Sequence, residues 1–120
     1  MIKICLFLAV FLISFLIPIS VYSPQIASYW RLKVKTDPVF AYVVQNESGG
    51  DPQAYNPKDT DGRPKYGLLQ FGWEEFYSWA PAAGIAQPDI WNPEHQTIVW
   101  NWAAKNGLLR QWGTFVKLFP

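Results

Sequence analysis

Cysteine is nearly absent from this chain of 120 residues. The one cysteine, Cys5, stands inside an uncharged apolar run near the amino terminus, so the rest of the sequence can form no disulfide and carries no thiol. Histidine is equally scarce, because His95 is the only one and no cysteine, histidine or acidic partners accompany it at the spacing of a metal site. We therefore expect a domain held together by packing, with no metal and no cofactor.

A charge excess of either sign is also lacking. Ten Lys and Arg face nine Asp and Glu, which leaves a formal net charge of +1. Proteins that bind nucleic acid carry clustered positive charge that attracts phosphates. The near-zero balance gives no support for such binding, so we expect no nucleic-acid partner. No internal repeat is visible, and the length suits one small domain, which we expect to be a monomer.

One long hydrophobic run is present. Lys3 precedes residues 4–19, which are uncharged and almost entirely apolar, as in a signal peptide. We expect residues 1–23 to be an export segment that places the protein in the periplasm or outside the cell. The alternative is an uncleaved anchor in the cytoplasmic membrane, because residues 4–22 approach the roughly 17–20 residues that span a bilayer. Residues 24–36 then form a connecting segment, and residues 37–120 form the folded domain.

A helix is predicted over residues 38–48. Asp37 can cap its first turn, Pro38 fits the first helical position, and Gly49 or Gly50 can end the helix in a left-handed conformation. Apolar residues recur along it at spacings of three and four. They mark the face that we expect to be buried, namely Val39, Phe40, Val43 and Val44.

Glu47 occupies the next position on this face, where an apolar residue would stabilise the helix better. Burial disfavours the charged form of a carboxylate and raises its pKa above the ~4.3 of free Glu. A general acid that works near neutral pH needs such a pKa. Glu47 is therefore the candidate catalytic residue. The alternative is a glutamate at a frayed helix end whose carboxylate reaches into solvent.

Irregular structure is predicted to follow this helix. Residues 49–65 are rich in Pro, Gly and Asp, so they form a loop or an irregular hairpin. A short helix covers residues 73–80 and stops before Pro81, because proline cannot continue the hydrogen-bonding pattern.

Two more helices are predicted near the carboxyl terminus. The first is capped by Asn92, ends at Gly107 and buries one face. The residues on that face are Ile98, Val99 and Trp102. A last short helix runs over residues 108–112 or beyond. The predicted fold class is thus α+β, mainly α-helical, with at most a small hairpin.

Two motifs stand at a defined spacing. The first, Glu47-Ser48-Gly49-Gly50, ends the capped helix, and the second runs Tyr66-Gly67-Leu68-Leu69-Gln70-Phe71, with Gln70 23 residues after Glu47. Together they resemble the lytic transglycosylase and goose-type lysozyme family (transglycosylase SLT domain). In that family a helix ends on a catalytic Glu followed by Ser, and a Gly-Leu-(Met/Leu)-Gln motif follows at a similar distance. The resemblance covers residues 38–112.

This resemblance implies a minimal lysozyme-like fold and an enzyme that cleaves peptidoglycan glycan strands between N-acetylmuramic acid and N-acetylglucosamine. It implies that Glu47 is the catalytic acid and that several residues contact the substrate, namely Ser48, Tyr66, Gly67, Leu68, Gln70 and Phe71. In lytic transglycosylases the same glutamate is thought to draw a proton next from the muramic acid 6-hydroxyl, so one carboxylate can suffice. The expected binding partner is the peptidoglycan strand.

Two alternatives stay open from the sequence. A hydrolytic lysozyme would use a second carboxylate to position water, and Asp51, Asp59 and Asp61 are candidates, although Asp beside Pro and Gly is typical of turns. A non-catalytic glycan-binding module could share the fold. Ser48 either helps to end the helix or contacts substrate. Seven Trp, six Tyr and eight Phe suit a core or a sugar-binding groove, and we expect most of them in the core.

Overall fold

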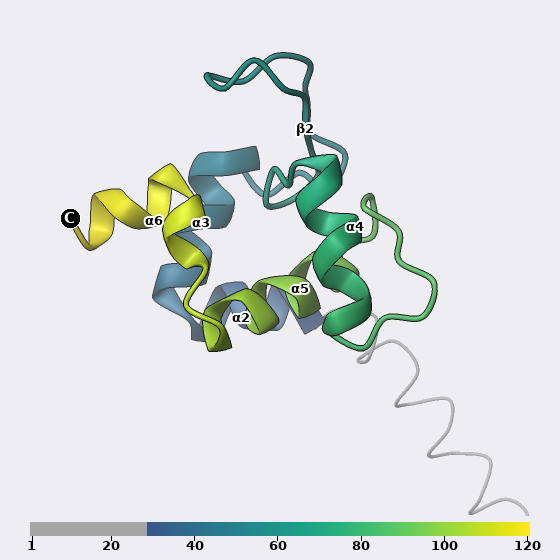
Figure 1. The fold of residues 1–120 in the computed structure, drawn as a ribbon. Coiled ribbons are helices and arrows are strands. Elements are labelled where there is room, and N and C mark those ends of the chain that lie inside the picture. Colours follow the sequence, from purple (N-terminus) through teal and green to yellow (C-terminus); the bar gives the residue numbers. More distant parts are fainter. Residues whose placement is uncertain (1–28) are drawn as a thin grey trace, which may run out of the picture.

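The computed structural model describes residues 29–120, so the expected export or anchor segment lies outside the described residues. The described part of the chain is mainly helical, with one two-stranded antiparallel sheet (Figure 1). Its elements are α2 (Tyr29–Thr36), α3 (Pro38–Ser48), β1 (Tyr55–Asn56), β2 (Lys65–Tyr66), α4 (Trp73–Ala82), α5 (Pro93–Lys105), the 3-10 helix η1 (Leu109–Gln111) and α6 (Gly113–Leu118). The predicted mainly helical α+β domain with a small hairpin is confirmed. Within residues 29–120, none of the helices is both long and apolar enough to span a membrane.

The helices surround a single core. Helix α3 packs against α2 and α6, whereas α5 packs against α2 and α4. In Figure 1, α3 and α6 stand on one side and α4 on the other, while the hairpin that ends in β2 rises above them. The hairpin pairs Tyr55 with Tyr66 and Asn56 with Lys65. The end of α3, the hairpin and the start of α4 therefore meet at the same end of the molecule.

Helix α3 begins and ends where the sequence predicts. The Asp37 carboxylate accepts hydrogen bonds of 3.1 Å from the backbone N–H groups of Val39 and Phe40. Gly49 ends the helix in the left-handed conformation, with φ 64°. The predicted buried face is confirmed for Phe40, Val43 and Val44, while Val39 is only half-buried.

Helix α2 replaces most of the expected connecting segment. Residues 29–36 pack against α3 and α5 and bury Trp30, so they belong to the folded domain. The Glu94 carboxylate, from the first turn of α5, accepts a hydrogen bond of 3.1 Å from the backbone N–H of Trp30. This cap comes from 64 residues away, so no local pattern in residues 24–36 could reveal it.

The chain also departs from prediction at two helix ends. The sequence predicts that helix α4 stops before Pro81, but it continues through Pro81 and ends at Ala82. A proline in the last turn removes only one backbone hydrogen bond, and the Ala83 N–H still donates to the Trp79 carbonyl at 2.9 Å. The last predicted helix is instead divided into η1 and α6, with Trp112 between them.

The buried face of α5 is partly different from the predicted one. Its Asn92 cap is confirmed, because the Asn92 side chain accepts hydrogen bonds from the backbone N–H groups of Glu94, at 2.9 Å, and His95, at 3.3 Å. Val99 is buried as predicted, but Ile98 is 37% exposed and Trp102 is half-buried. Two polar residues take part in the buried face, which consists of Gln96, Thr97, Val99, Trp100 and Ala103. Hydrophobicity alone cannot identify such a face, because hydrogen bonding permits the polar residues to be buried.

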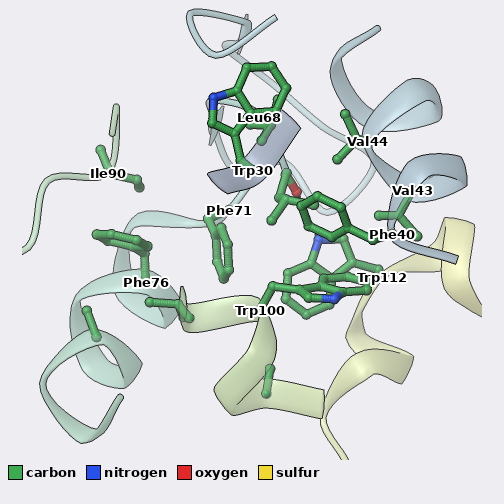
Figure 2. Close-up of a cluster of buried hydrophobic side chains, with 14 of the residues drawn as sticks. Trp30, Phe40, Val43, Val44, Leu68, Phe71, Phe76, Ile90, Trp100 and Trp112 are labelled. Carbon is green, nitrogen blue, oxygen red and sulfur yellow. The ribbon is translucent and has the colours of Figure 1, made fainter. Parts of the chain in front are cut away.

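Aromatic rings fill the core, as Figure 2 shows. Phe71 makes edge-to-face contacts with Phe76 and Trp112, at centroid distances of 5.5 and 5.1 Å. Trp100 lies edge-on to Phe40 at 5.8 Å and to Trp112 at 4.9 Å. Such pairs add to the stabilisation that comes from burying the rings themselves. They join α3, α5 and the segment after β2 without any cross-link.

The backbone at the end of β2 and just after it is held by two side chains, Gln96 and Trp112. Gln96 is fully buried, and its Oε1 accepts a hydrogen bond of 2.7 Å from the Leu69 N–H. Its Nε2 donates to the Tyr66 carbonyl at 2.9 Å and to the Ile90 carbonyl at 2.6 Å. The Trp112 indole N–H donates to the Leu69 carbonyl at 2.8 Å. These bonds fix the backbone immediately before Gln70.

Candidate active site

A small cleft lies between the end of α3, the hairpin and the start of α4. Its volume is about 160 Å³. Carboxylates and cations share its walls with aromatic rings and a glutamine amide. The lining residues are Glu47, Asp59, Asp61, Arg63, Lys65, Gln70, Phe71, Gly72, Glu75, Trp79, Gln111, Trp112 and Gly113. The two residues on which the predicted site depends, Glu47 and Gln70, thus line the same cleft.

Glu47 is half-buried at the end of α3. Burial raises the pKa of its carboxyl group, and the negative charge of Asp59 acts in the same direction. A hydrogen bond of 2.8 Å from the Thr114 hydroxyl to Oε1 opposes this rise, as do the charges of Lys65 and Lys117. The net effect is a raised pKa, so Glu47 keeps a proton to higher pH than a free glutamate.

This raised pKa predicts a pH dependence of stability. The folded chain resists ionising Glu47, so the unfolded chain releases that proton first as the pH rises above the ordinary value of 4.5. Wild type should therefore lose stability relative to Glu47→Gln, starting near that pH and levelling off above the folded-state pKa. Urea unfolding of both proteins from pH 4 to pH 8 measures the difference. A difference that is constant with pH, or that grows in favour of wild type, would contradict a raised pKa.

The Gln70 amide is held by two backbone carbonyls. The residue adopts a left-handed backbone conformation, with φ 52°, which is uncommon for a residue other than glycine. Its Nε2 donates to the carbonyls of Gly67, at 3.0 Å, and Ala54, at 3.2 Å. These bonds fix the amide plane and occupy its donor side, so Oε1 is the atom that can accept a hydrogen bond from a ligand hydroxyl.

The other predicted substrate contacts fall in different places. Phe71 lines the cleft, but it is 2% exposed and so forms part of the floor. The side chain of Leu68 is fully buried in the core. At Gly67 a Cβ atom would overlap the Gln96 amide nitrogen, so glycine here permits close approach by α5. Neither Leu68 nor Gly67 lines the cleft.

Ser48 and Tyr66 do not line the cleft either. The Ser48 hydroxyl donates to the Val44 carbonyl at 3.2 Å and accepts from Gly50 N–H at 3.2 Å, so it serves the end of the helix. Tyr66 follows Lys65 on β2, and successive side chains of a strand point to opposite faces. Lys65 lines the cleft, whereas Tyr66 packs with other rings, namely Tyr55, Trp73 and Trp91.

The cleft rim carries an ion-pair cluster that sequence reasoning missed. Asp61 lies 2.7 Å from Lys65 and 3.3 Å from Arg63, and Arg63 lies 2.8 Å from Glu75. The hydrogen bond from Lys65 is the main reason why the pKa of Asp61 falls to about 2. For Glu75, burial acts to raise the pKa, but the hydrogen bond from Arg63 and nearby positive charge outweigh it. Both carboxylates therefore stay ionised, in contrast to Glu47, whose pKa rises.

Trp79 supplies an aromatic wall. It is half-buried on α4, and its ring packs against Phe71, Trp102 and Trp112 at centroid distances of 6.4, 5.9 and 6.3 Å. These neighbours hold the ring in place while part of it stays accessible in the cleft. An aromatic ring of this kind can stack on an apolar ligand face.

A second hollow lies between α3, α5 and the carboxyl-terminal helices. It is larger, at about 550 Å³, and residues such as Trp100, Leu109 and Phe115 line it. Its carboxylate, Asp37, caps α3 and pairs with Lys33 at 3.0 Å. Burial acts to raise the pKa of Asp37, but hydrogen bonds from Phe40 and Lys33 hold it below the ordinary value. The chemistry therefore favours the Glu47 cleft as the candidate site, despite its smaller volume.

Comparison with known proteins gives no match: no protein-family model, no curated protein and no solved structure matches this chain. Among residues 29–120, no group of three or more His, Cys, Asp or Glu side chains is placed to hold a metal ion. What the site can do is therefore inferred from its residues and their geometry. They provide a carboxyl group with a raised pKa, a fixed amide acceptor and an aromatic wall within one cleft.

Proposed function

We propose that this chain cleaves the glycan strands of peptidoglycan between N-acetylmuramic acid and N-acetylglucosamine, as a lytic transglycosylase. The observation that carries the proposal is the half-buried Glu47 carboxyl group, with its raised pKa, in one cleft with Gln70. The motif resemblance implies that Glu47 is the catalytic acid and that Gln70 contacts the substrate. Their position in one cleft supports the proposal. The substrate lies outside the cytoplasm, which suits export or anchoring through residues 1–23.

In this mechanism Glu47 acts twice. It first gives its proton to the glycosidic oxygen of the leaving N-acetylglucosamine, as the bond to the muramic acid carbon breaks and positive charge builds on that carbon. The ionised Glu47 then takes the proton of the muramic acid 6-hydroxyl, whose oxygen bonds to the same carbon. An anhydro ring forms, no water is consumed, and Glu47 is protonated again. A single carboxyl group therefore completes the cycle.

The size of the cleft suits a polymer better than a small ligand. Pockets for drug-sized ligands enclose roughly 300–1,000 Å³, whereas this cleft has about 160 Å³. It can therefore hold the groups around one glycosidic bond, while the rest of a strand lies along the surface. Trp79 would stack on one sugar, and Gln70 Oε1 would accept a hydrogen bond from a sugar hydroxyl.

Incubation with purified peptidoglycan tests the proposal. Soluble glycan fragments should appear with wild type and stay at background with Glu47→Gln. If wild type binds the insoluble polymer without releasing fragments, the chain is a glycan-binding module and the proposed activity is wrong.

A hydrolytic lysozyme is the second candidate, and one observation favours it. Asp59 also lines the cleft, and its charge acts on Glu47, so a second carboxylate stands within the site. In an inverting hydrolase it would activate a water molecule on the far face of the sugar. Asp59 belongs to the hairpin loop, where its backbone N–H donates to the Arg63 carbonyl at 3.0 Å.

We expect Asp51→Asn, Asp59→Asn and Asp61→Asn each to retain most of the activity, because intramolecular attack needs no second carboxylate. Asp51 is exposed and accepts a hydrogen bond of 2.9 Å from Gln53 N–H within a turn, while Asp61 is held by cations. Initial rates of fragment release measure the three variants. A loss for Asp59→Asn as large as that for Glu47→Gln would assign the hydrolytic mechanism instead.

A further inference from the structure

Thr114 forms a direct hydrogen bond with the Glu47 carboxyl group. It stands in the first turn of α6, and its hydroxyl donates to Glu47 Oε1 at 2.8 Å. Helix α6 packs against α3, so the contact joins residues that are 67 positions apart in the chain. Thr114 lies beyond residues 38–112, to which the motif resemblance extends. Neither the resemblance nor any local pattern assigns it a role.

The two Glu47 oxygens therefore have different surroundings. Oε1 accepts the Thr114 hydrogen bond, whereas Oε2 accepts none from residues 29–120. The half-buried Glu47 side chain lines the cleft, so Oε2 is the carboxyl oxygen left for a ligand there. While the Thr114 hydroxyl donates to Oε1, it occupies one lone-pair position of that oxygen, whereas Oε2 keeps both of its own.

We propose that Thr114 is a positioning residue, whose hydroxyl holds Oε1 of Glu47 and leaves Oε2 as the oxygen that carries the proton and delivers it into the cleft. This inference rests on the proposed function for its catalytic meaning. The positioning of Oε1 by Thr114 does not depend on that function, because it follows from the hydrogen bond and from the packing of α6 against α3.

Other charged groups act on Glu47 from a distance. Asp59 and Lys65 act on it from the hairpin, and Lys117 acts from α6. Further charged residues line the cleft, namely Asp61, Arg63 and Glu75. None of these described residues donates a hydrogen bond to Glu47, so removing the Thr114 hydroxyl should change its surroundings in a way that no neighbour compensates. Because that hydrogen bond favours the charged form, its loss should raise the Glu47 pKa further.

The test compares Thr114→Ser, which keeps the hydroxyl, with Thr114→Val, which keeps the shape but removes the donor. The first readout is the carbon-13 NMR titration of labelled Glu side chains, with the Glu47 signal assigned by its absence from Glu47→Gln. We expect the titration to move to higher pH in Thr114→Val and to stay near the wild-type position in Thr114→Ser. Thr36→Val is the matched control, since Thr36 is exposed on α2 and its hydroxyl donates to the Leu32 carbonyl within its own helix.

The second readout is the rate of peptidoglycan cleavage against pH. Thr114→Val should lower kcat by roughly ten- to a hundredfold with little change in KM, because a misdirected proton donor loses efficiency. The alkaline limb of its profile should also move to higher pH, whereas Thr114→Ser should stay within about twofold of wild type. Thr114→Ala serves as the donor-free variant if Thr114→Val fails to fold.

Three outcomes would overturn the inference. They are an unchanged Glu47 titration in the donor-free variant, an unchanged rate in that variant, and a Thr114→Ser protein as impaired as Thr114→Val. The two proposals can fail separately. If wild type releases no fragments, the proposed function fails, while the NMR titration still decides whether Thr114 holds the Glu47 carboxyl group.

Discussion

Glu47→Gln is expected to lower peptidoglycan cleavage by about a hundredfold or more, with the fold preserved. General acid–base catalysis contributes roughly 10²–10⁴-fold to a rate, and an amide cannot supply the proton. The glutamine Oε1 can still accept the hydrogen bond from Thr114, so the contact between α3 and α6 should survive. Fragment release from purified peptidoglycan, followed over time, measures the effect.

Glu94→Gln is the matched control for this variant. Glu94 is also a half-buried glutamate whose pKa is raised by burial, but it caps α2 and does not line the cleft. Its substitution can change stability, yet the rate per folded molecule should stay close to wild type. If Glu47→Gln kept more than about a tenth of the activity, a barrier change under ~1.4 kcal/mol, Glu47 would not be the acid.

Gln96→Leu is expected to produce the largest loss of stability, on the order of 3–5 kcal/mol. The substitution keeps a side chain of similar size but removes the partners of the Leu69 N–H and of the Ile90 carbonyl. The Tyr66 carbonyl loses one of its two hydrogen bonds and keeps the one from Phe71 N–H. A buried polar group left without a partner costs ~1–3 kcal/mol. The free energy of unfolding of a native protein is about 5–15 kcal/mol, so the expected loss is a large fraction of the total stability.

Urea unfolding at neutral pH measures this change, with Gln45→Leu as the control. Gln45 is exposed on α3, and its side chain is not placed in the core. Its substitution should change the free energy of unfolding by less than about 0.5 kcal/mol. A loss under ~1 kcal/mol for Gln96→Leu would show that the Gln96 amide does not hold the segment before Gln70.

The helices that the sequence predicts best are those with local caps. Asp37 before α3 and Asn92 before α5 both accept hydrogen bonds from the first turn that follows them. Such a cap is a contact between near neighbours, so a sequence pattern can show it. Helix α2 is different, because its first turn is capped by Glu94 from another helix. A pattern limited to residues 24–36 contains no trace of that carboxylate.

In the candidate site, too, the residues found from local patterns differ from those placed by tertiary packing. Helical register places Glu47 toward the interior, and the motif spacing pairs it with Gln70, which lines the same cleft. The expected substrate contacts of Ser48 and Tyr66 come from motif adjacency, yet neither residue lines the cleft. The Ser48 hydroxyl bonds to its own helix end, and Tyr66 packs on other aromatic rings. Thr114 and Trp79 reach the site only through tertiary packing, which spacing in the sequence does not encode.

Mass spectrometry of the fragments released from purified peptidoglycan tests the central claim most directly, with Glu47→Gln as the parallel sample. Intramolecular attack consumes no water, so wild type should yield fragments that end in anhydro-muramic acid and are lighter by one water than the hydrolytic products. The Glu47→Gln sample should contain none of them. Fragments with reducing ends would assign hydrolysis with a second carboxylate, for which Asp59 is the candidate. Intact polymer after incubation with the folded wild-type protein would contradict the proposed activity altogether.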